Sequence, residues 1–155
     1  MKTSCLWLFC LVSITVVFSS LTTAEAALGG SADSVAADRK ALSAAKRATT
    51  SRNGYTVQEI ESDATVVREY VSSSGVVFAI AWQGLMHPNL KALLGSYNRE
   101  YQAALKQTSR RMGRRRQQVL TDQVVVEKWG HMRNLQGRAY APALIPAGVT
   151  IDEIK

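Results

Sequence analysis

Three closely spaced runs of β-branched and aromatic residues constrain the fold of this chain most strongly. They cover residues 55–60, 65–71 and 76–82, and short polar segments at 61–64 and 72–75 separate them. Strands joined by such short turns pair as an antiparallel meander. In the second run, successive residues point to opposite faces, so one face can pack on a core while the other carries charge, whereas the third run is almost wholly apolar. We therefore expect the second strand to be half-buried and the third to lie at the centre of a sheet.

A helix is predicted after this section, opening at Pro88 and ending near Lys106. The residues Leu90, Leu94, Tyr97, Tyr101 and Leu105 recur at helical spacing, so they lie on one face. Gly95 interrupts the run. Because the apolar stripe keeps its phase across Gly95, we favour one continuous helix with a close backbone contact there. The alternative is a break, with Ser96 capping a second short helix.

The remaining segments complete an α+β prediction: about five antiparallel strands packed against one main amphipathic helix, with a short N-terminal helix. That short helix covers residues 31–47 and ends in a turn at 49–54. Residues 107–118 are predicted as a basic exposed loop. A later hairpin joins strands 119–128 and 131–140 around Trp129-Gly130, and Thr150 caps a last helical turn at 151–154.

The first 26 residues have the features of a signal peptide. Lys2 is followed by an apolar run at 6–18 that is too short to span a bilayer, and by the small-residue cleavage pattern Ala24-Glu25-Ala26. We expect a single exported domain, residues 27–155, in the periplasm or secreted. Both cysteines, Cys5 and Cys10, would be removed with the leader, which excludes disulfides and thiolate metal sites. No later segment is apolar enough for a transmembrane helix.

The net charge of +7 favours anionic partners. Outside the cytoplasm these are lipid headgroups, acidic glycans and acidic proteins more often than nucleic acid, so no nucleic acid is expected. Five guanidinium groups within seven residues form the strongest candidate binding site, at Arg110, Arg111, Arg114, Arg115 and Arg116. The alternative is a solvated linker that only keeps the protein soluble.

Other chemistry-bearing residues give weaker patterns. His87 and His131 lack metal-ligand spacing, and no metal or cofactor is expected. Glu59, Glu69 and Glu127 could serve as an acid or base, or could simply pair with basic residues across strands. Aromatic side chains could line a pocket or form ordinary core; the pocket candidates are Tyr70, Trp82, Tyr97 and Trp129, with His131.

Several blocks in order resemble an uncharacterised family of short exported bacterial proteins, catalogued as a domain of unknown function. These are residues 66–71 (VVREYV), 75–78 (GVVF), 81–84 (AWQG), 93–97 (LLGSY), 130–132 (GHM), 137–140 (GRAY), 145–149 (IPAGV) and 152–154 (DEI). The resemblance covers nearly all of the chain after the leader and implies a bacterial source and an extracytoplasmic location. It brings no catalytic residues.

These observations favour a non-enzymatic exported domain that binds an anionic envelope component or a partner protein. Two alternatives remain open at this point. One is a small periplasmic enzyme that pairs His131 or His87 with Glu69 or Glu127. The other is an assembly factor that captures other exported proteins along an open strand edge.

Overall fold

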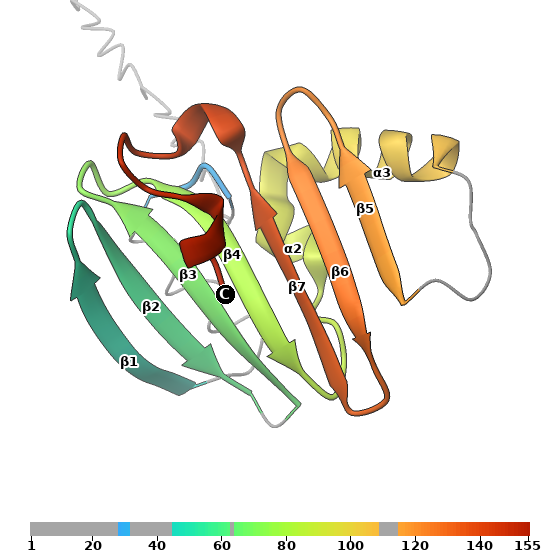
Figure 1. Ribbon diagram of the computed structural model, residues 1–155, viewed down its shortest axis with the longest axis horizontal. Helices are drawn as coiled ribbons and strands as arrows, with labels where there is room; N and C mark the ends of the chain where they lie inside the picture. The colour runs from blue at the N-terminus through green and yellow to red at the C-terminus, as the bar shows by residue number, and fades with distance from the viewer. Residues whose placement is uncertain (1–27, 32–44, 63, 109–114) are drawn as a thin grey trace, which may run out of the picture.

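The computed structural model describes residues 28–31, 45–62, 64–108 and 115–155. Within them the dominant element is one antiparallel sheet of seven strands in the order β1-β2-β3-β4-β7-β6-β5 (Figure 1). The strands are β1 (Ala45–Arg52), β2 (Tyr55–Glu61), β3 (Thr65–Ser72), β4 (Val77–Gly84), β5 (Arg116–Leu120), β6 (Val125–His131) and β7 (Asn134–Tyr140).

The predicted meander is confirmed as β2, β3 and β4, and the apolar strand β4 lies at the centre of the sheet. Five strands were too few, because β1 and β5 extend the sheet at its two edges. The fold is α+β only in the loose sense that one helical segment accompanies a mostly β architecture.

The strand β1 corrects the N-terminal prediction. Residues 45–52 are extended and pair with β2, so the helix predicted for residues 31–47 does not reach its expected end, and residues 49–52 are not a turn. Ser31 forms an isolated antiparallel bridge with Val76, whereas residues 32–44 of that predicted helix, and the signal peptide, lie outside the described residues. A two-residue loop, Asn53-Gly54, joins β1 to β2, and Gly54 has a φ of +86°. Asn-Gly between two strands is a strong hairpin signal.

The helical segment consists of α2 (Leu90–Leu94), a 3-10 turn η2 (Gly95–Tyr97) and α3 (Asn98–Gln107). The 3-10 turn interrupts the α-helix at Gly95, where φ is +48°, which corrects the favoured prediction of one continuous helix and agrees with the alternative of a break. However, Asn98 follows a helical Tyr97 without a side-chain cap, so Ser96 is not the cap. The predicted stripe is confirmed, because Leu94 and Tyr101 are buried and Leu90, Tyr97 and Leu105 pack against the same core. No helix in the described residues is long and apolar enough to cross a membrane.

The second half of the sheet differs from its prediction in three places. The strand predicted over residues 119–128 is divided by the segment 121–124, which joins β5 to β6 as a hairpin. Arg116–Leu120 is strand β5, so the predicted loop of residues 107–118 is helix at its start and strand at its end. Trp129 and Gly130 lie within β6, and the β6–β7 turn is Met132-Arg133. Gly130 is needed there because a Cβ would lie 2.1 Å from the Asn134 carbonyl oxygen, a close approach rather than a turn.

Each face of the sheet has its own core. The helical segment covers one face over residues such as Val67, Ile80 and Val126. The chain end crosses the other face, in front of the sheet in Figure 1, through η3 (Pro142–Leu144) and η4 (Ile151–Glu153). This second face buries Tyr55, Tyr70, Phe78, Tyr140 and Ile154. The predicted helical turn near residues 151–154 is confirmed, with the Thr150 N–H donating to Glu153 Oε1 over 2.9 Å.

Candidate functional site

The sheet face opposite the helices carries the clearest polar site. Residues 150–155, the C-terminal strap, cross this face and are held by side chains of the sheet. Tyr70 Oη donates to the Lys155 main-chain oxygen over 2.8 Å, and Arg138 Nη1 donates to the Ile151 carbonyl over 2.8 Å. Ile154 is 1% exposed and anchors the strap in the core of this face. The strap leaves a hollow on each side, and Asp152 and Lys155 line both.

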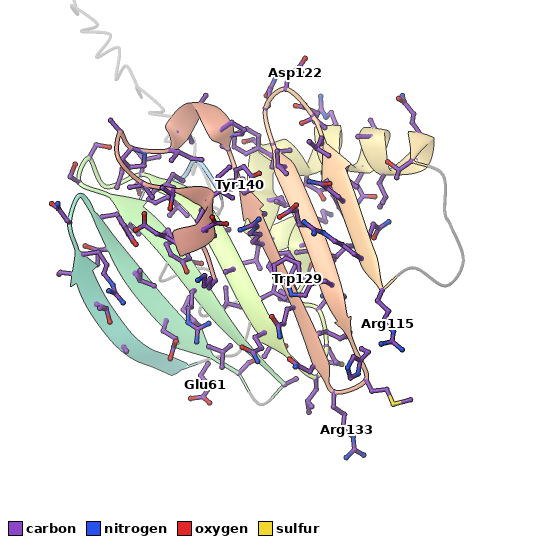
Figure 2. The ribbon with its side chains drawn as sticks, in the orientation of Figure 1. Glu61, Arg115, Asp122, Trp129, Arg133 and Tyr140 are labelled. Atoms are coloured by element: carbon purple, nitrogen blue, oxygen red, sulfur yellow. The ribbon has the colours of Figure 1, made fainter. Side chains whose placement is uncertain are left out.

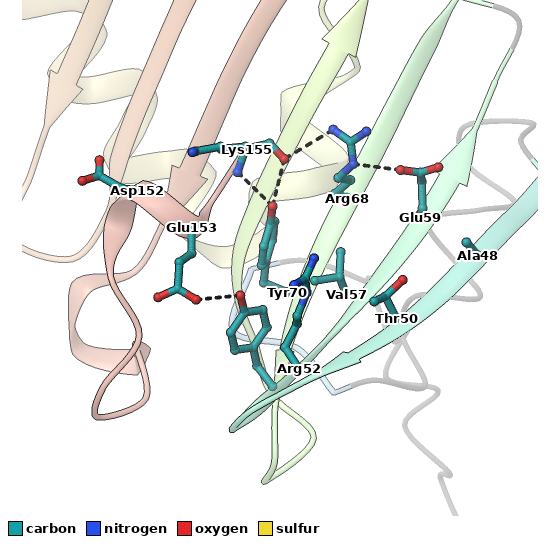
Figure 3. A pocket seen from close by; sticks show the side chains of 11 residues that line it. Ala48, Thr50, Arg52, Val57, Glu59, Arg68, Tyr70, Asp152, Glu153 and Lys155 are labelled. Carbon is teal, nitrogen blue, oxygen red and sulfur yellow. Dashed lines mark hydrogen bonds and ion pairs between the residues drawn. The ribbon is translucent and has the colours of Figure 1, made fainter.

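The β2–β3 hollow lies on the side of strands β1 to β3 and has a volume of about 550 Å³ (Figure 3). Arg68 bridges it by donating from Nε to Glu59 over 2.8 Å and from Nη1 to the Lys155 main-chain oxygen over 3.3 Å. Tyr55 Oη donates to Glu153 over 2.9 Å. Its lining holds three basic and three acidic side chains: Arg52, Arg68, Lys155, Glu59, Asp152 and Glu153. The formal charges of this hollow therefore balance.

The β6–β7 hollow lies on the other side of the strap and has a volume of about 410 Å³. Its centre is Glu127, whose side chain is 3% exposed and accepts hydrogen bonds from Arg116 over 2.9 Å and from Arg138. Gln118 adds a further hydrogen bond over 2.7 Å. Three basic side chains line this hollow (Arg116, Arg138 and Lys155) against two acidic ones (Glu127 and Asp152). It therefore carries an excess of positive charge.

The two arginines keep Glu127 ionised despite its burial. Burial alone would raise the pKa of this carboxyl, but hydrogen bonds and charges from Arg138 and Arg116 outweigh it and hold the pKa below the ordinary value. A buried carboxylate with two guanidinium partners is a fixed anchor for the arginines. Because Arg138 is bound so firmly, its role is positional, whereas Arg116 is 64% exposed at the mouth of the hollow.

Aromatic rings fix the arginine position further. The Arg138 guanidinium lies 5.9 Å from the Trp129 ring centroid and 6.0 Å from that of Tyr140. Trp129 is itself held, since its Nε1 donates to Gln136 over 3.1 Å. Both aromatic side chains lie on the strap side of the sheet (Figure 2). The β6–β7 hollow is therefore lined by the half-buried indole ring of Trp129 next to the guanidinium groups of Arg138 and Arg116.

The predicted arginine segment is only partly described. Arg115 and Arg116 are exposed at the start of β5, whereas Arg110, Arg111 and Arg114 lie outside the described residues. β5 is an edge strand of the sheet, and its first residue, Arg116, lines the β6–β7 hollow.

The five residues considered for an aromatic pocket are not brought together. Tyr70 and Trp129 line the two separate hollows, whereas Trp82 and Tyr97 belong to the core on the opposite face. His131 is exposed at the end of β6. Across the described part of the chain, these residues line no common cavity.

Comparison with known proteins gives one result at the level of the family. A family model described as "Protein of unknown function (DUF2844)" matches residues 24–154. The chain belongs to the DUF2844 family. This confirms the resemblance to a family of unknown function. No curated protein and no solved structure matches the chain.

Histidines and carboxylates of this DUF2844 member do not meet in the described structure. His87 Nδ1 accepts a hydrogen bond from Trp82 Nε1 over 2.9 Å, and burial, helped by the charge of Lys128, lowers its pKa. Glu127 instead pairs with arginines, and Glu59 pairs with Arg68 as the cross-strand alternative anticipated. Glu69 is buried on the helix-covered side of β3. Within the described ranges, no three acidic, histidine or cysteine side chains converge as metal ligands.

Sequence reasoning missed three contributors to the site, namely Gln118, Arg138 and the strap. Arg138 and Glu127 are paired residues of neighbouring strands, but that pairing depends on a register set by the Met132-Arg133 turn. A turn placed at Trp129-Gly130 brings different residues opposite each other. The strap had no sequence signal beyond the Thr150 cap.

Proposed function

We propose that this protein is a non-enzymatic exported domain that binds an anionic group of a cell-envelope component or a partner protein. The binding residues are Arg115 and Arg116 with the preceding Arg110, Arg111 and Arg114, and the β6–β7 hollow receives the bound group. The observation that carries the proposal is the position of Arg116. It is exposed, it lines a hollow with surplus positive charge, and it ends the arginine segment.

The chemistry of the hollow suits a carboxylate or a phosphate. Guanidinium groups bind such anions through paired hydrogen bonds. Arg116 donates to Glu127 through Nη2, so its other donors can face a ligand. Arg138 and Glu127 hold each other and the neighbouring rings in place, which lowers the ordering cost of binding. Trp129 adds an apolar surface for the uncharged part of the ligand.

The test replaces all five arginines with alanine and measures binding to anionic vesicles and acidic envelope glycans across a salt series. Each lost phosphate contact should reduce the salt dependence of the affinity, by a slope of about one in the log–log plot. Arg99→Ala is the matched control, because Arg99 is exposed on α3, away from the hollow. Equal, salt-insensitive binding by the wild type and the five-arginine variant would reject the proposal.

Export is part of the same proposal. The protein isolated from its host should begin at Ala27, and N-terminal sequencing measures this directly. A chain that retains Met1 in the cytosolic fraction would move the proposed partner toward nucleic acid.

An assembly factor for other exported proteins is the second candidate. It is favoured by β5, which ends the sheet and, among the described residues, has no backbone hydrogen-bond partner on its outer side. Such an edge can pair with an extended segment of another chain. Pull-down from a periplasmic extract, compared between wild type and a proline substitution at Gln117, separates this candidate from binding through arginine alone.

A further inference from the structure

The tip of the β6–β7 hairpin has residues that its turn does not favour. Met132 and Arg133 form a two-residue loop between His131 and Asn134, and both have positive φ, +22° and +39°. A two-residue turn of this kind favours Asn, Asp or Gly, because other side chains are strained at positive φ. The chain has Asn53-Gly54 in the corresponding loop between β1 and β2.

Packing in the core does not explain why a methionine occupies this turn either. Met132 is 87% exposed, the highest value among the exposed large apolar residues of the described chain. The turn sets the β6–β7 register, but Asn or Gly would do so without the strain and without an apolar side chain in water, and such outliers motivate a hypothesis of function. The tip is therefore a candidate contact site for an apolar partner.

Further apolar residues lie at the same end of the sheet. Leu85 and Met86 follow the end of β4 and are 53% and 60% exposed. Gly84, just before them, pairs with Leu135, two residues after the Met132-Arg133 turn. The "hairpin end" is defined here as Leu85, Met86, Met132 and Arg133.

Charge at this end is uneven. Arg133 and Arg115 both lie at this end of the sheet, whereas Asp122 lies at the opposite end (Figure 2). Glu61, an exposed acid among the described residues, also lies at this end, on the β2 side and away from β5 to β7. The side that carries Met132 therefore combines exposed apolar atoms with guanidinium groups.

We propose that the hairpin end docks onto an anionic lipid membrane, with Met132, Leu85 and Met86 entering the headgroup boundary and Arg133 and Arg115 binding lipid phosphates. Apolar area and attraction to anionic lipids together give peripheral membrane binding. Scattered apolar side chains on a protruding turn suit a soft interface better than a preformed protein groove. The inference rests on the proposed function for its charge component and adds a separate apolar component.

The test uses the double variant Met132→Asn/Arg133→Gly, measured by co-sedimentation with phosphatidylglycerol vesicles and with phosphatidylcholine vesicles. This variant installs the favoured turn, so its melting temperature should not fall. Its affinity for the anionic vesicles should drop about tenfold or more. The single variant Met132→Asn should lose affinity by a similar factor at low and at high salt, because apolar insertion is not screened.

Leu120→Asn is the matched control. Leu120 is 63% exposed but lies at the other end of the sheet, beside the loop that carries Asp122, so vesicle binding should be unchanged. If Met132→Asn binds like the wild type while the five-arginine variant does not, the membrane inference falls and the proposed anion binding stands. If the wild type ignores vesicles but binds an acidic glycan or a partner protein, the inference is also overturned. If the wild type binds none of these, the proposed function itself fails.

Discussion

Both hollows beside the C-terminal strap are lined by arginine, glutamate and aromatic side chains, but they differ in net charge. In the β2–β3 hollow one arginine, Arg68, pairs with one carboxylate, Glu59, and both side chains are partly exposed, at 32% and 19%. In the β6–β7 hollow Glu127 is 3% exposed and takes two arginines. Burying the carboxylate under two guanidinium groups leaves a positive surplus, whereas Arg68 and Glu59 offset each other's charge.

This difference indicates which hollow is a scaffold and which can bind. A neutral, half-exposed pair stabilises a fold only slightly, and here it also helps to hold the strap through Arg68 and Tyr70. A buried carboxylate with an excess of cations costs desolvation, which a purely structural role does not require. The β6–β7 hollow is therefore where we place ligand binding.

The largest expected contrast comes from removing each carboxylate. Glu127→Ala leaves Arg138, 17% exposed, without its partner and should cost about 3 kcal/mol of unfolding free energy. Glu59→Ala should cost less than about 1 kcal/mol. Chemical denaturation of both variants measures the difference. Similar costs for the two variants would remove the distinction between the hollows.

Lowering the pH should also test the role of Glu127, because protonation removes the charge that binds its two arginines. The folded pKa of Glu127 lies below its ordinary value of 4.5, because its arginine partners outweigh burial. Its stabilising contribution is therefore complete above about pH 4.5 and is lost as the pH falls through the folded pKa. The urea midpoint of the wild type should drop on acidification more steeply than that of Glu127→Gln. Parallel curves for the two proteins would show that Glu127 is not a source of acid sensitivity.

A smaller effect is expected on the β2–β3 side, where Tyr70 holds the strap. Tyr70→Phe removes one hydrogen bond to the Lys155 main-chain oxygen and one from the Lys155 N–H, at a cost of about 1 kcal/mol. Tyr140→Phe is the matched control, because within the described chain the hydroxyl of the buried Tyr140 makes no hydrogen bond. Amide exchange at Lys155 should accelerate in Tyr70→Phe only. Equal exchange rates in both variants would mean that the strap is held elsewhere.

The periodicity and residue types of short segments correctly predicted those helices and strands whose burial in the fold matches their sequence. The runs that became β2, β3 and β4 are β-branched because they pack on both sides, and the stripe from Leu90 to Leu105 has helical spacing because one side meets the core. The Asn53-Gly54 hairpin also had a local signal, which was assigned to the end of a helix instead. β1 could therefore have been predicted from sequence.

The β6–β7 turn could not be predicted from local preference. Trp129-Gly130 contains the residue that a turn favours, but the chain turns at Met132-Arg133, against that preference. Because the predicted turn was in the wrong place, the predicted register of β6 and β7 was wrong too, and the pairing of Glu127 with Arg138 was missed. Polar residues such as Gln117 and Gln118 likewise show no strand pattern, and they are extended because β6 supplies their partners.

The sequence alone determined a central β meander, a helix with one apolar face, a basic segment and membership in a family of unknown function, because these depend on residue type and spacing within short stretches. Only the tertiary structure decided that β7 lies beside β4 and that the strap crosses one face. The register of β5 on β6 and of β6 on β7 brings Arg116, Glu127 and Arg138 together from three strands. A site assembled across strands depends on register and chain crossing, and neither is encoded in a local period.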